Sequence, residues 1–296
     1  MRPVSAPRDE PDGELQDRVE RILGWRPTSW RRVRGGYTPA ARYLAARGAL
    51  SAFVKIATTP ITAEMLRGEL AAYAAVDGPF LPRFFGGEDH ASRPFLVIED
   101  LAAARWPPPW TDADVADTLA AIQAMHLVRP TLPSVLARHS DKVQGWRTIA
   151  EQPDPFLSLG LAGRDWLAAA LPALVAAETA CPLDGQALAH FDLRSDNICL
   201  TERGPVFVDW AAACLGDPDV DLGGWLPSLA FEGGPPPESI LPQAPLVAAW
   251  ISGYFAARAG LPDIPDAPFV RRVQREQLST ALPWVQRALR LPPLDG

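Results

Sequence analysis

The segment LAHFDLRSDNICLTERGPVFVDW, residues 188–210, is the feature that most limits what this chain can fold into. Short apolar runs bounded by polar turns predict short strands, and three such runs lie here, at 187–189, 197–200 and 205–209. Polar side chains gather between and after these runs: His190, Asp192, Asn197 and Asp209. Burying so many polar groups is costly unless they form hydrogen bonds or ion pairs with one another. We therefore expect the fold to bring them to one site.

These residues form the pattern H-x-D-x-x-x-x-N, followed twelve residues later by a carboxylate that ends an apolar run. Transfer of a phosphoryl group from ATP needs a carboxylate to orient the attacking hydroxyl and accept its proton, and it needs oxygen ligands for Mg²⁺. Asp192 suits the first role. Asn197 and Asp209 suit the second, because phosphate oxygens and water complete the shell of Mg²⁺.

The order of the expected elements divides the chain near residue 101. Before this point we expect a short N-terminal tail, a helix over 13–24, three strands within 29–57, a helix over 61–76, and strands near 83–88 and 94–100. After it the pattern is mostly helical, with helices over 111–127, 162–180 and from 245 onward. The sequence thus predicts a small β-rich part, residues 1–101, and a larger α-helical part, residues 102–296.

Residues 190–209 resemble the catalytic loop of the protein-kinase-like superfamily. The resemblance is closest to the aminoglycoside phosphotransferase and choline kinase branch, whose members phosphorylate small molecules, and it covers most of the chain. It implies an α+β, bilobal protein-kinase-like fold, with ATP between a small β-rich N-lobe and a larger α-helical C-lobe. It also implies that Asp192 is the catalytic base and that Asn197 and Asp209 hold magnesium.

The resemblance extends to the nucleotide side. Lys55 ends the apolar run in AFVKIA and resembles the lysine that holds the α- and β-phosphates. In this family that lysine pairs with a glutamate on the following helix. Glu69 is the preferred partner, and Glu64 stays open because both could face the sheet. Lys55 is also set apart by rarity, since the chain has one other lysine, Lys142.

Two further segments complete the expected nucleotide site. The run PFLVIEDL resembles the strand that enters the hinge, where backbone groups near Glu99 and Leu101 would meet adenine. The loop RGGYTPA places Gly35 and Gly36 where the family has its phosphate loop. It lacks G-x-G-x-x-G, and two adjacent glycines alone also fit a plain hairpin turn. The expected nucleotide is ATP or GTP.

Other residues of the pattern have supporting roles. Asp221, in GDPDVDL, matches a family residue that braces the catalytic loop, and His126 matches a structural helix histidine. We expect His190 to brace the loop rather than to act as an acid or base. Arg194 has two interpretations: an ion pair with Asp196, or contact with the transferred phosphate.

Departures from the protein-kinase pattern narrow the function. Phe191 occupies the position of the arginine that responds to phosphorylation of the activation loop in protein kinases. Asp209 is followed by Trp210 rather than by Phe-Gly, and no obvious activation segment or A-P-E motif is present. These features favour a constitutively competent small-molecule kinase. A catalytically silent, ligand-binding pseudokinase is the alternative, and a peptide or protein kinase is a weaker one. The four histidines lack metal-ligand spacing and no G-x-S-x-G occurs, which disfavours a zinc enzyme or an α/β-hydrolase.

The expected acceptor is a small molecule with a free hydroxyl, such as an aminoglycoside-like antibiotic, an amino sugar or an amino alcohol. Acidic residues of the second part favour a cationic acceptor, although a solvated surface also explains them: Asp217, Asp219, Glu232 and Glu238. Three tryptophans are candidates for either the core or a substrate pocket: Trp225, Trp250 and Trp284. The oligomeric state stays open.

Charge and composition exclude several classes. The net charge of −7 argues against a nucleic-acid partner. No apolar run reaches the length of a membrane span, and the N-terminus lacks the apolar core of a signal peptide. Three cysteines, an odd number without C-x-x-C, predict no disulfide framework. We therefore expect a cytoplasmic protein without membrane or nucleic-acid partners.

Overall fold

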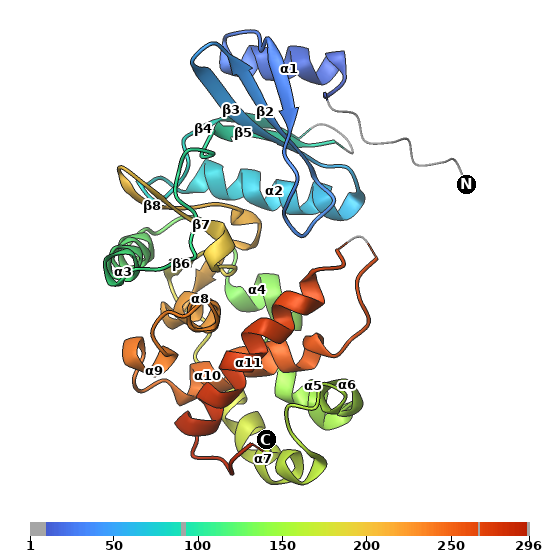
Figure 1. Cartoon of the computed structure of the whole chain (residues 1–296), viewed down its shortest axis with the longest axis vertical. Helices are drawn as coiled ribbons and strands as arrows, with labels where there is room; N and C mark the ends of the chain where they lie inside the picture. Colours follow the sequence, from blue (N-terminus) through green and yellow to red (C-terminus); the bar gives the residue numbers. More distant parts are fainter. Residues whose placement is uncertain (1–9, 90–92, 266, 295–296) are drawn as a thin grey trace, which may run out of the picture.

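The structure, a computed structural model, describes residues 10–89, 93–265 and 267–294, so most of the expected N-terminal tail lies outside the described residues. The first part contains α1 (Gly13–Leu23), β1 (Ser29–Arg32), β2 (Ala41–Arg47), β3 (Leu50–Ile56), α2 (Pro60–Ala75), β4 (Phe84–Glu88) and β5 (Phe95–Glu99). These are the elements expected from the sequence, in the expected order. The strands form one antiparallel sheet with the order β1-β2-β3-β5-β4 (Figure 1).

Alternation of side chains along β5 gives the sheet two different faces. Phe95 and Val97 pack with Val19 of α1 in one apolar cluster. Leu96 and Ile98 belong to a second cluster, which they share with α2 and with the helices of the second part. As Figure 1 shows, α2 lies between the sheet and the rest of the molecule. Polar side chains of α2 can therefore reach the space between the two parts.

The second part is mainly helical. Its elements are α3 (Asp112–His126), α4 (Val135–His139), η1 (Ser140–Lys142), α5 (Gly145–Glu151), α6 (Asp154–Leu157), α7 (Arg164–Thr179), β6 (Ala187–Ala189), η2 (Ser195–Asn197), β7 (Ile198–Thr201), β8 (Gly204–Phe207), η3 (Trp210–Ala212), β9 (Cys214–Gly216), α8 (Asp219–Phe231), α9 (Pro237–Ile240), α10 (Pro245–Ala259) and α11 (Val270–Ala288). The expected helices appear as α3, α7, α10 and α11. The boundary at residue 101 stays a prediction.

Two small sheets frame the polar segment that opened the sequence analysis. Strands β6 and β9 pair with each other, and β7 and β8 form a hairpin. The expected strand over 205–209 ends at Phe207, so Asp209 lies just beyond it. The N–H of Phe207 donates to the carbonyl of Phe80, which fixes this hairpin against the first part.

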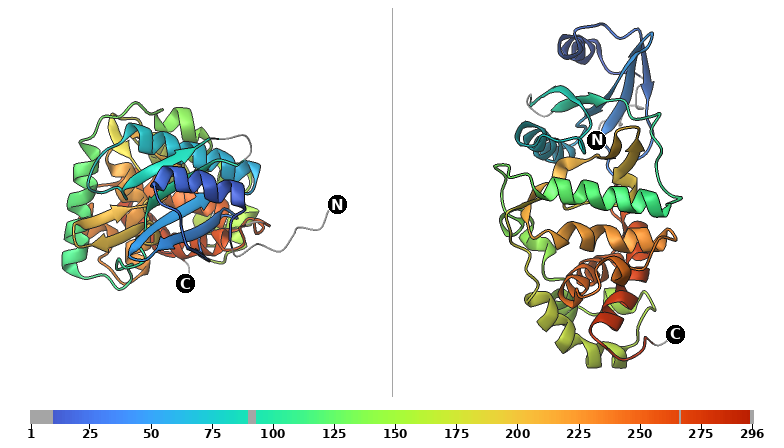
Figure 2. Two further views of the ribbon diagram at one scale, coloured as in Figure 1. Left: turned by 90° about the horizontal axis from the view of Figure 1, so that it is seen from above. Right: turned by 90° about the vertical axis from the view of Figure 1, so that its left-hand side faces the viewer.

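The core of the second part is centred on α10, which packs against α5, α7 and α11. Trp225 and Trp284 are fully buried, so these two candidates for a substrate pocket fill the core instead. Figure 2 shows an elongated molecule, with the sheet and α1 at one end and the helices of the second part at the other. Within the described ranges, no helix is long and apolar enough to cross a membrane.

Candidate active site

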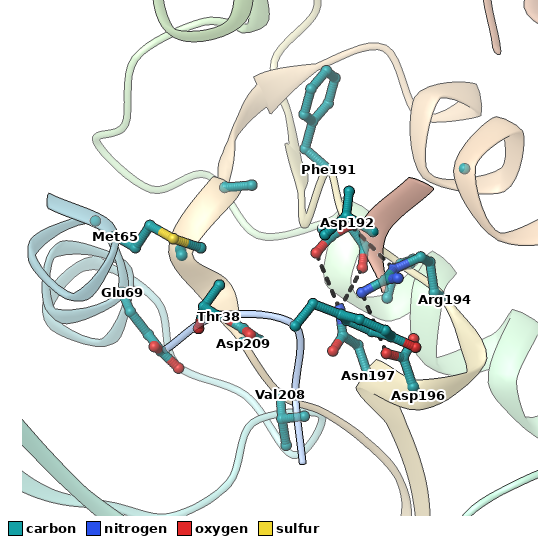
Figure 3. A pocket seen from close by; sticks show the side chains of 18 of the residues that line it. Thr38, Met65, Glu69, Phe191, Asp192, Arg194, Asp196, Asn197, Val208 and Asp209 are labelled. Atoms are coloured by element: carbon teal, nitrogen blue, oxygen red, sulfur yellow. Dashed lines mark hydrogen bonds and ion pairs between the residues drawn. The ribbon is translucent and has the colours of Figure 1, made fainter. Parts of the chain in front are cut away.

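A cavity of about 1400 Å³ is lined by both parts of the chain. Every residue expected at the site lines it: Gly35, Gly36, Lys55, Glu69, Glu99, Leu101, Asp192, Asn197 and Asp209. They come from the β1–β2 loop, β3, α2, the end of β5 and the segment after it, the loop after β6 together with η2, and the segment after β8. Figure 3 shows Glu69, Asp192, Asn197 and Asp209 grouped in this cavity. The fold therefore gathers residues that lie far apart in the sequence.

The catalytic loop begins at His190, directly after β6, and is held by Asp221 at the start of α8. The buried Asp221 carboxylate accepts the N–H of His190 at 3.0 Å and the N–H of Phe191 at 2.8 Å. His126 contributes its Nε2 at 3.2 Å from the same carboxylate. Because Phe191 has a positive φ of 63°, the loop turns sharply at this point. Asp221 and His126 thus have the bracing roles that the sequence indicated.

His190 is fully buried and does not line the cavity. Its Nε2 lies 3.0 Å from the carbonyl of Val208, and its Nδ1 lies 3.3 Å from the N–H of Asp192. With the carbonyl at Nε2 and the amide N–H at Nδ1, both ring nitrogens have partners and the ring is held in one orientation. The buried ring thus holds the loop, as expected, and does not line the cavity.

The carboxylate of Asp192 reaches the cavity and is 46% exposed. The side-chain amide of Asn197 donates to the Asp192 carbonyl at 2.8 Å and contacts its carboxylate at 3.3 Å. Arg194 lies 3.3 Å from the carboxylates of both Asp192 and Asp196, so the ion pair expected for Arg194 forms. These contacts fix the direction of Asp192 while leaving its carboxylate open to a ligand (Figure 3).

Asp209 follows β8 in the left-handed conformation, with φ 65° and ψ 59°. This unusual conformation turns its side chain toward β3, where Lys55 Nζ lies 2.9 Å from Asp209 Oδ1. Lys55 Nζ also donates to Glu69 Oε2 at 2.8 Å. Of the two glutamates left open by the sequence, Glu69 is therefore the partner, and Glu64 lines the cavity without contacting Lys55.

Electrostatics favour the charged forms of Lys55 and Asp209. Burial disfavours the charged form of Lys55, but attraction by Asp209 and Glu69 outweighs it and raises the pKa of Lys55. Burial likewise opposes ionisation of Asp209, and attraction by Lys55 still holds the pKa of Asp209 below its ordinary value. Burial raises the pKa of Glu69, although attraction by Lys55 opposes this effect. The site thus presents an ammonium beside the Asp209 carboxylate, which suits binding of an anionic phosphate chain together with a cation.

The position of α2 is fixed by close packing beside this cluster. Gly68, next to Glu69, lies against the carbonyl of Ala211 in η3, and a Cβ added to Gly68 would lie 2.6 Å from that oxygen. Arg138 donates to the same carbonyl at 2.7 Å. The absence of a side chain at Gly68 therefore allows α2 to pack directly on the segment that follows Asp209.

The donor set fits a hard divalent cation. Asn197 uses its amide nitrogen for Asp192, which leaves its amide oxygen, and Asp209 uses Oδ1 for Lys55, which leaves Oδ2. Amide and carboxylate oxygens are ligands that Mg²⁺ accepts. Across the described residues, no three His, Cys, Asp or Glu side chains form a metal cluster. A cation in this cavity would therefore rely on Asn197 and Asp209 together with oxygen atoms of a ligand.

The β1–β2 loop is longer than a hairpin turn and spans eight residues, 33–40. Gly35 and Gly36 both have positive φ, at 127° and 75°, and both line the cavity. The ring of Tyr37 lies 4.9 Å from the Arg194 guanidinium, so the loop reaches the catalytic loop. The two glycines therefore lie in a long loop between two paired antiparallel strands rather than in a tight turn, and their role in phosphate binding stays a prediction.

Some of the backbone groups that the resemblance assigns to adenine, at the end of β5 and just after it, already have hydrogen-bond partners within the chain. The N–H of Glu99 donates to the carbonyl of Arg83 at 2.9 Å, and its carboxylate pairs with Arg203 at 2.6 Å. The carbonyl of Leu101 accepts from Ala104 at 3.0 Å. Both residues line the cavity, and their contact with adenine stays a prediction.

Sequence reasoning missed part of the cavity lining. Arg42 of β2 lines it and is held by the carbonyls of Thr38 and Ala40. Lys142 also lines it, and only its rarity in the sequence could have drawn attention to it. In contrast, the four acidic residues thought to attract a cationic acceptor do not line the cavity: Asp217, Asp219, Glu232 and Glu238. These four residues therefore would not contact a ligand in this cavity, and the charge of the acceptor stays a prediction.

Comparison with solved structures identifies the fold. Among them is the aminoglycoside phosphotransferase APH(4)-Ia, with 13% identity and a TM-score of 0.60 over 94% of this chain and 98% of that one. Another is the choline kinase LicA from Streptococcus pneumoniae, with 16% identity and a TM-score of 0.56 over 90% of this chain and 98% of that one. A third is the spectinomycin phosphotransferase APH(9)-Ia in complex with ADP and spectinomycin, with 13% identity and a TM-score of 0.53 over 95% of each chain.

At these identities the solved structures show the fold alone, and they confirm the α+β, bilobal kinase-like architecture. Among curated proteins, none matches the chain. The family model described as the phosphotransferase enzyme family matches residues 29–263, which is well over half of the chain. The resemblance stated from the sequence is thereby confirmed, and with it the expected class of enzyme: this chain belongs to the phosphotransferase enzyme family.

Proposed function

We propose that this chain transfers the terminal phosphoryl group of ATP, or of GTP, to a hydroxyl of a small molecule with the help of Mg²⁺. The observation that carries the proposal is the meeting of Asp192, Asn197 and Asp209 with the Lys55–Glu69 pair in one cavity. Solved structures of APH(4)-Ia with ADP and hygromycin B, and with AMP-PNP and hygromycin B, support a nucleotide and a small acceptor in a cavity of this fold.

On the nucleotide side, Lys55 offers an ammonium that Glu69 holds in place. An anionic phosphate chain would receive this charge directly, and Gly35 and Gly36 leave the loop above the cavity without side chains that would keep phosphates away. Asn197 and Asp209 would hold Mg²⁺, which when bound neutralises charge on the phosphates. The segment from Glu99 to Leu101 would meet the adenine through its backbone.

On the acceptor side, Asp192 has the role of catalytic base. Its carboxylate is exposed to the cavity and oriented by Asn197 and Arg194, so it can accept a hydrogen bond from an acceptor hydroxyl and then its proton. Because phosphoryl transfer asks little covalent chemistry of the protein, most of the rate enhancement would come from this positioning and from charge stabilisation. Arg194 lies next to Asp192 and adds a positive charge there.

Location and partners remain part of the proposal. Three free thiols, those of Cys181, Cys199 and Cys214, fit the reducing conditions of the cytoplasm. The expected partner is a small molecule with a free hydroxyl, and we expect neither a nucleic acid nor a membrane as a partner. The choice between ATP and GTP is open to direct competition of the two nucleotides.

The decisive experiment is the Asp192→Asn variant, assayed for nucleoside diphosphate release and for phosphorylated product with a library of hydroxyl compounds. We expect turnover to fall by roughly 10²–10⁴, because a positioned base contributes about that factor. Nucleotide binding and thermal unfolding should match the unsubstituted chain, because the carboxylate is exposed. Unchanged turnover would remove Asp192 from the mechanism. Nucleotide binding without product from any hydroxyl compound would favour the silent alternative.

A further inference from the structure

The acceptor end of the cavity, which we define by Phe191, Trp250, Tyr254 and Phe269, has a distinct chemical character. These rings come from the catalytic loop, from α10 and from the segment before α11. Phe269 is 54% exposed, and Ile61 at the start of α2 is 70% exposed and lines the same cavity. Exposed apolar side chains contributed by both parts of the chain favour a ligand with a sizeable apolar surface.

Lys142 adds a positive charge at this end. It ends η1 and lines the cavity, and its ammonium lies 5.5 Å from the centre of the Phe191 ring. It forms no ion pair with any residue that the structure describes. Burial lowers the pKa of Lys142, and attraction by Asp192 and Asp141 offsets part of this effect. A partly buried cation without a carboxylate partner is a binding site for an anion.

One face of three rings at this end is already covered by a cation of the chain. The basic side chains are Lys142 over Phe191 at 5.5 Å, Arg258 over Tyr254 at 4.4 Å, and Arg272 over Phe269 at 5.4 Å. Ring faces are what an aromatic site offers to a quaternary or protonated amine. These three faces are therefore not available to such a ligand.

The carboxylates of this end are paired with arginines. Asp192 and Asp196 both pair with Arg194. Asp141 is 74% exposed, and it lies near Arg258, which donates to its backbone carbonyl. Arg272 lies 3.5 Å from Glu276. Among the described residues, Lys142 is therefore a cation of this end without a carboxylate partner.

On the basis of the function proposed above, we propose that the acceptor combines an apolar or aromatic body with an anionic group, and that Lys142 binds this anion while the hydroxyl lies at Asp192. Trp250 lines the same end and adds to its aromatic lining. A cationic acceptor would place its charge next to Lys142 and would be repelled.

Binding is tested with the full chain in the presence of Mg²⁺ and AMP-PNP. The probes are three biphenyl methanols that differ in one substituent: a carboxylate, a carboxamide or an aminomethyl group. Calorimetry should give a dissociation constant for the carboxylate that is roughly tenfold lower than for the carboxamide, because a charge-assisted contact is worth about that factor. The aminomethyl compound should bind most weakly. Equal binding of the three, or preference for the amine, overturns the inference.

Two substitutions assign the preference to Lys142. Lys142→Met should remove the advantage of the carboxylate over the carboxamide, and Lys142→Glu should reverse it in favour of the amine. Arg287→Met is the matched control, because Arg287 pairs with Glu238 away from the cavity, and it should keep the preference. Retention of the preference in both Lys142 variants contradicts the inference. Circular dichroism confirms that each variant is folded before its binding is compared.

Chemical labelling gives an independent readout, because the chain has two lysines and Lys55 is buried between carboxylates. An amine-directed acylating reagent should modify Lys142 faster than Lys55, and the carboxylate probe should slow labelling of Lys142 at least several-fold. Unchanged labelling in the presence of saturating probe overturns the inference. Binding and protection without any phosphorylated product would instead remove the proposed function and leave the anion site standing.

Discussion

The two lysines of the chain line the same cavity in opposite surroundings. Lys55 has two carboxylates within 2.9 Å, and their attraction raises its pKa. Lys142 has an aromatic ring beside it and no described ion-pair partner, and burial lowers its pKa. A lysine held between two carboxylates is a rigid part of the site. A lysine without such a partner can instead form a strong charge-assisted contact with an anionic ligand. In our proposals, this contrast distinguishes the lysine that binds phosphate from the lysine that selects the acceptor.

The largest effect is expected from Lys55→Met. This substitution leaves Glu69 and Asp209 close together without the cation between them, and breaking such a buried pair costs about 3–5 kcal/mol of stability. Turnover at saturating acceptor should fall by roughly 10²–10³, because a charge that stabilises the transferring phosphoryl group is lost. Denaturant unfolding and steady-state kinetics measure the two effects. A variant with the stability and turnover of the unsubstituted chain would place Lys55 outside the nucleotide site.

A second prediction concerns how pH changes the stability of the helices that support the acceptor end. The acceptor end is built on α10, which packs against α5, and the buried Glu178 accepts the N–H groups of Trp146 and Arg147 at the start of α5. Burial raises the pKa of Glu178 to about 7 in the folded chain. Because the folded chain then holds a proton that the unfolded chain releases, the free energy of unfolding falls as pH rises through the window from about 4.5 to 7.

Glu178→Gln isolates this contribution. The variant cannot release the proton, so the stability difference between the variant and the unsubstituted chain should shift in favour of the variant by about 2–3 kcal/mol between pH 4.5 and 7.5. Urea unfolding at several pH values measures this difference. A difference that does not change with pH would show that the backbone N–H groups keep Glu178 ionised when folded.

The smallest expected effect tests the packing of α2. Gly68→Ala places a methyl group against the Ala211 carbonyl, which should shift α2 and loosen the contact of Glu69 with Lys55. We expect about a tenfold loss of turnover and an increased KM for the nucleotide, although alanine usually favours a helix over glycine by about 1 kcal/mol. Gly13→Ala in α1 is the control, because a Cβ there meets nothing within 4 Å. Full turnover in Gly68→Ala would show that α2 has room to adjust.

The contrast between the two lysines also marks how far the sequence could predict the site. Lys55, Asp192, Asn197 and Asp209 belong to a pattern with fixed order and spacing, because their chemistry requires those residue types at those places. The choice between Glu64 and Glu69 could not be made from spacing, since it depends on how α2 packs on its neighbours. The acceptor end has no such pattern: from Lys142 to Phe269, its residues come from segments spread over more than a hundred positions.

Prediction of the secondary structure has the same limit. In the strands of the first part, apolar and polar residues alternate or the run is wholly apolar, so the order of these strands was predictable. Helix α8 was missed because glycines and an internal proline, Pro227, interrupt its sequence, and burial of its apolar side chains stabilises it instead. Strand β9 has three residues and is defined only by its pairing with β6. Elements that depend on tertiary contacts leave little local signal.

The contact of Gly68 with Ala211 has a consequence for control of the enzyme. An outward swing of α2 would separate Glu69 from Lys55, but it would also have to pull the helix away from the backbone that follows Asp209. No side chain at Gly68 spaces the two segments apart, so this movement would expose backbone that is now in contact. The same glycine that lets Glu69 reach Lys55 would thus make such a swing of the helix costly.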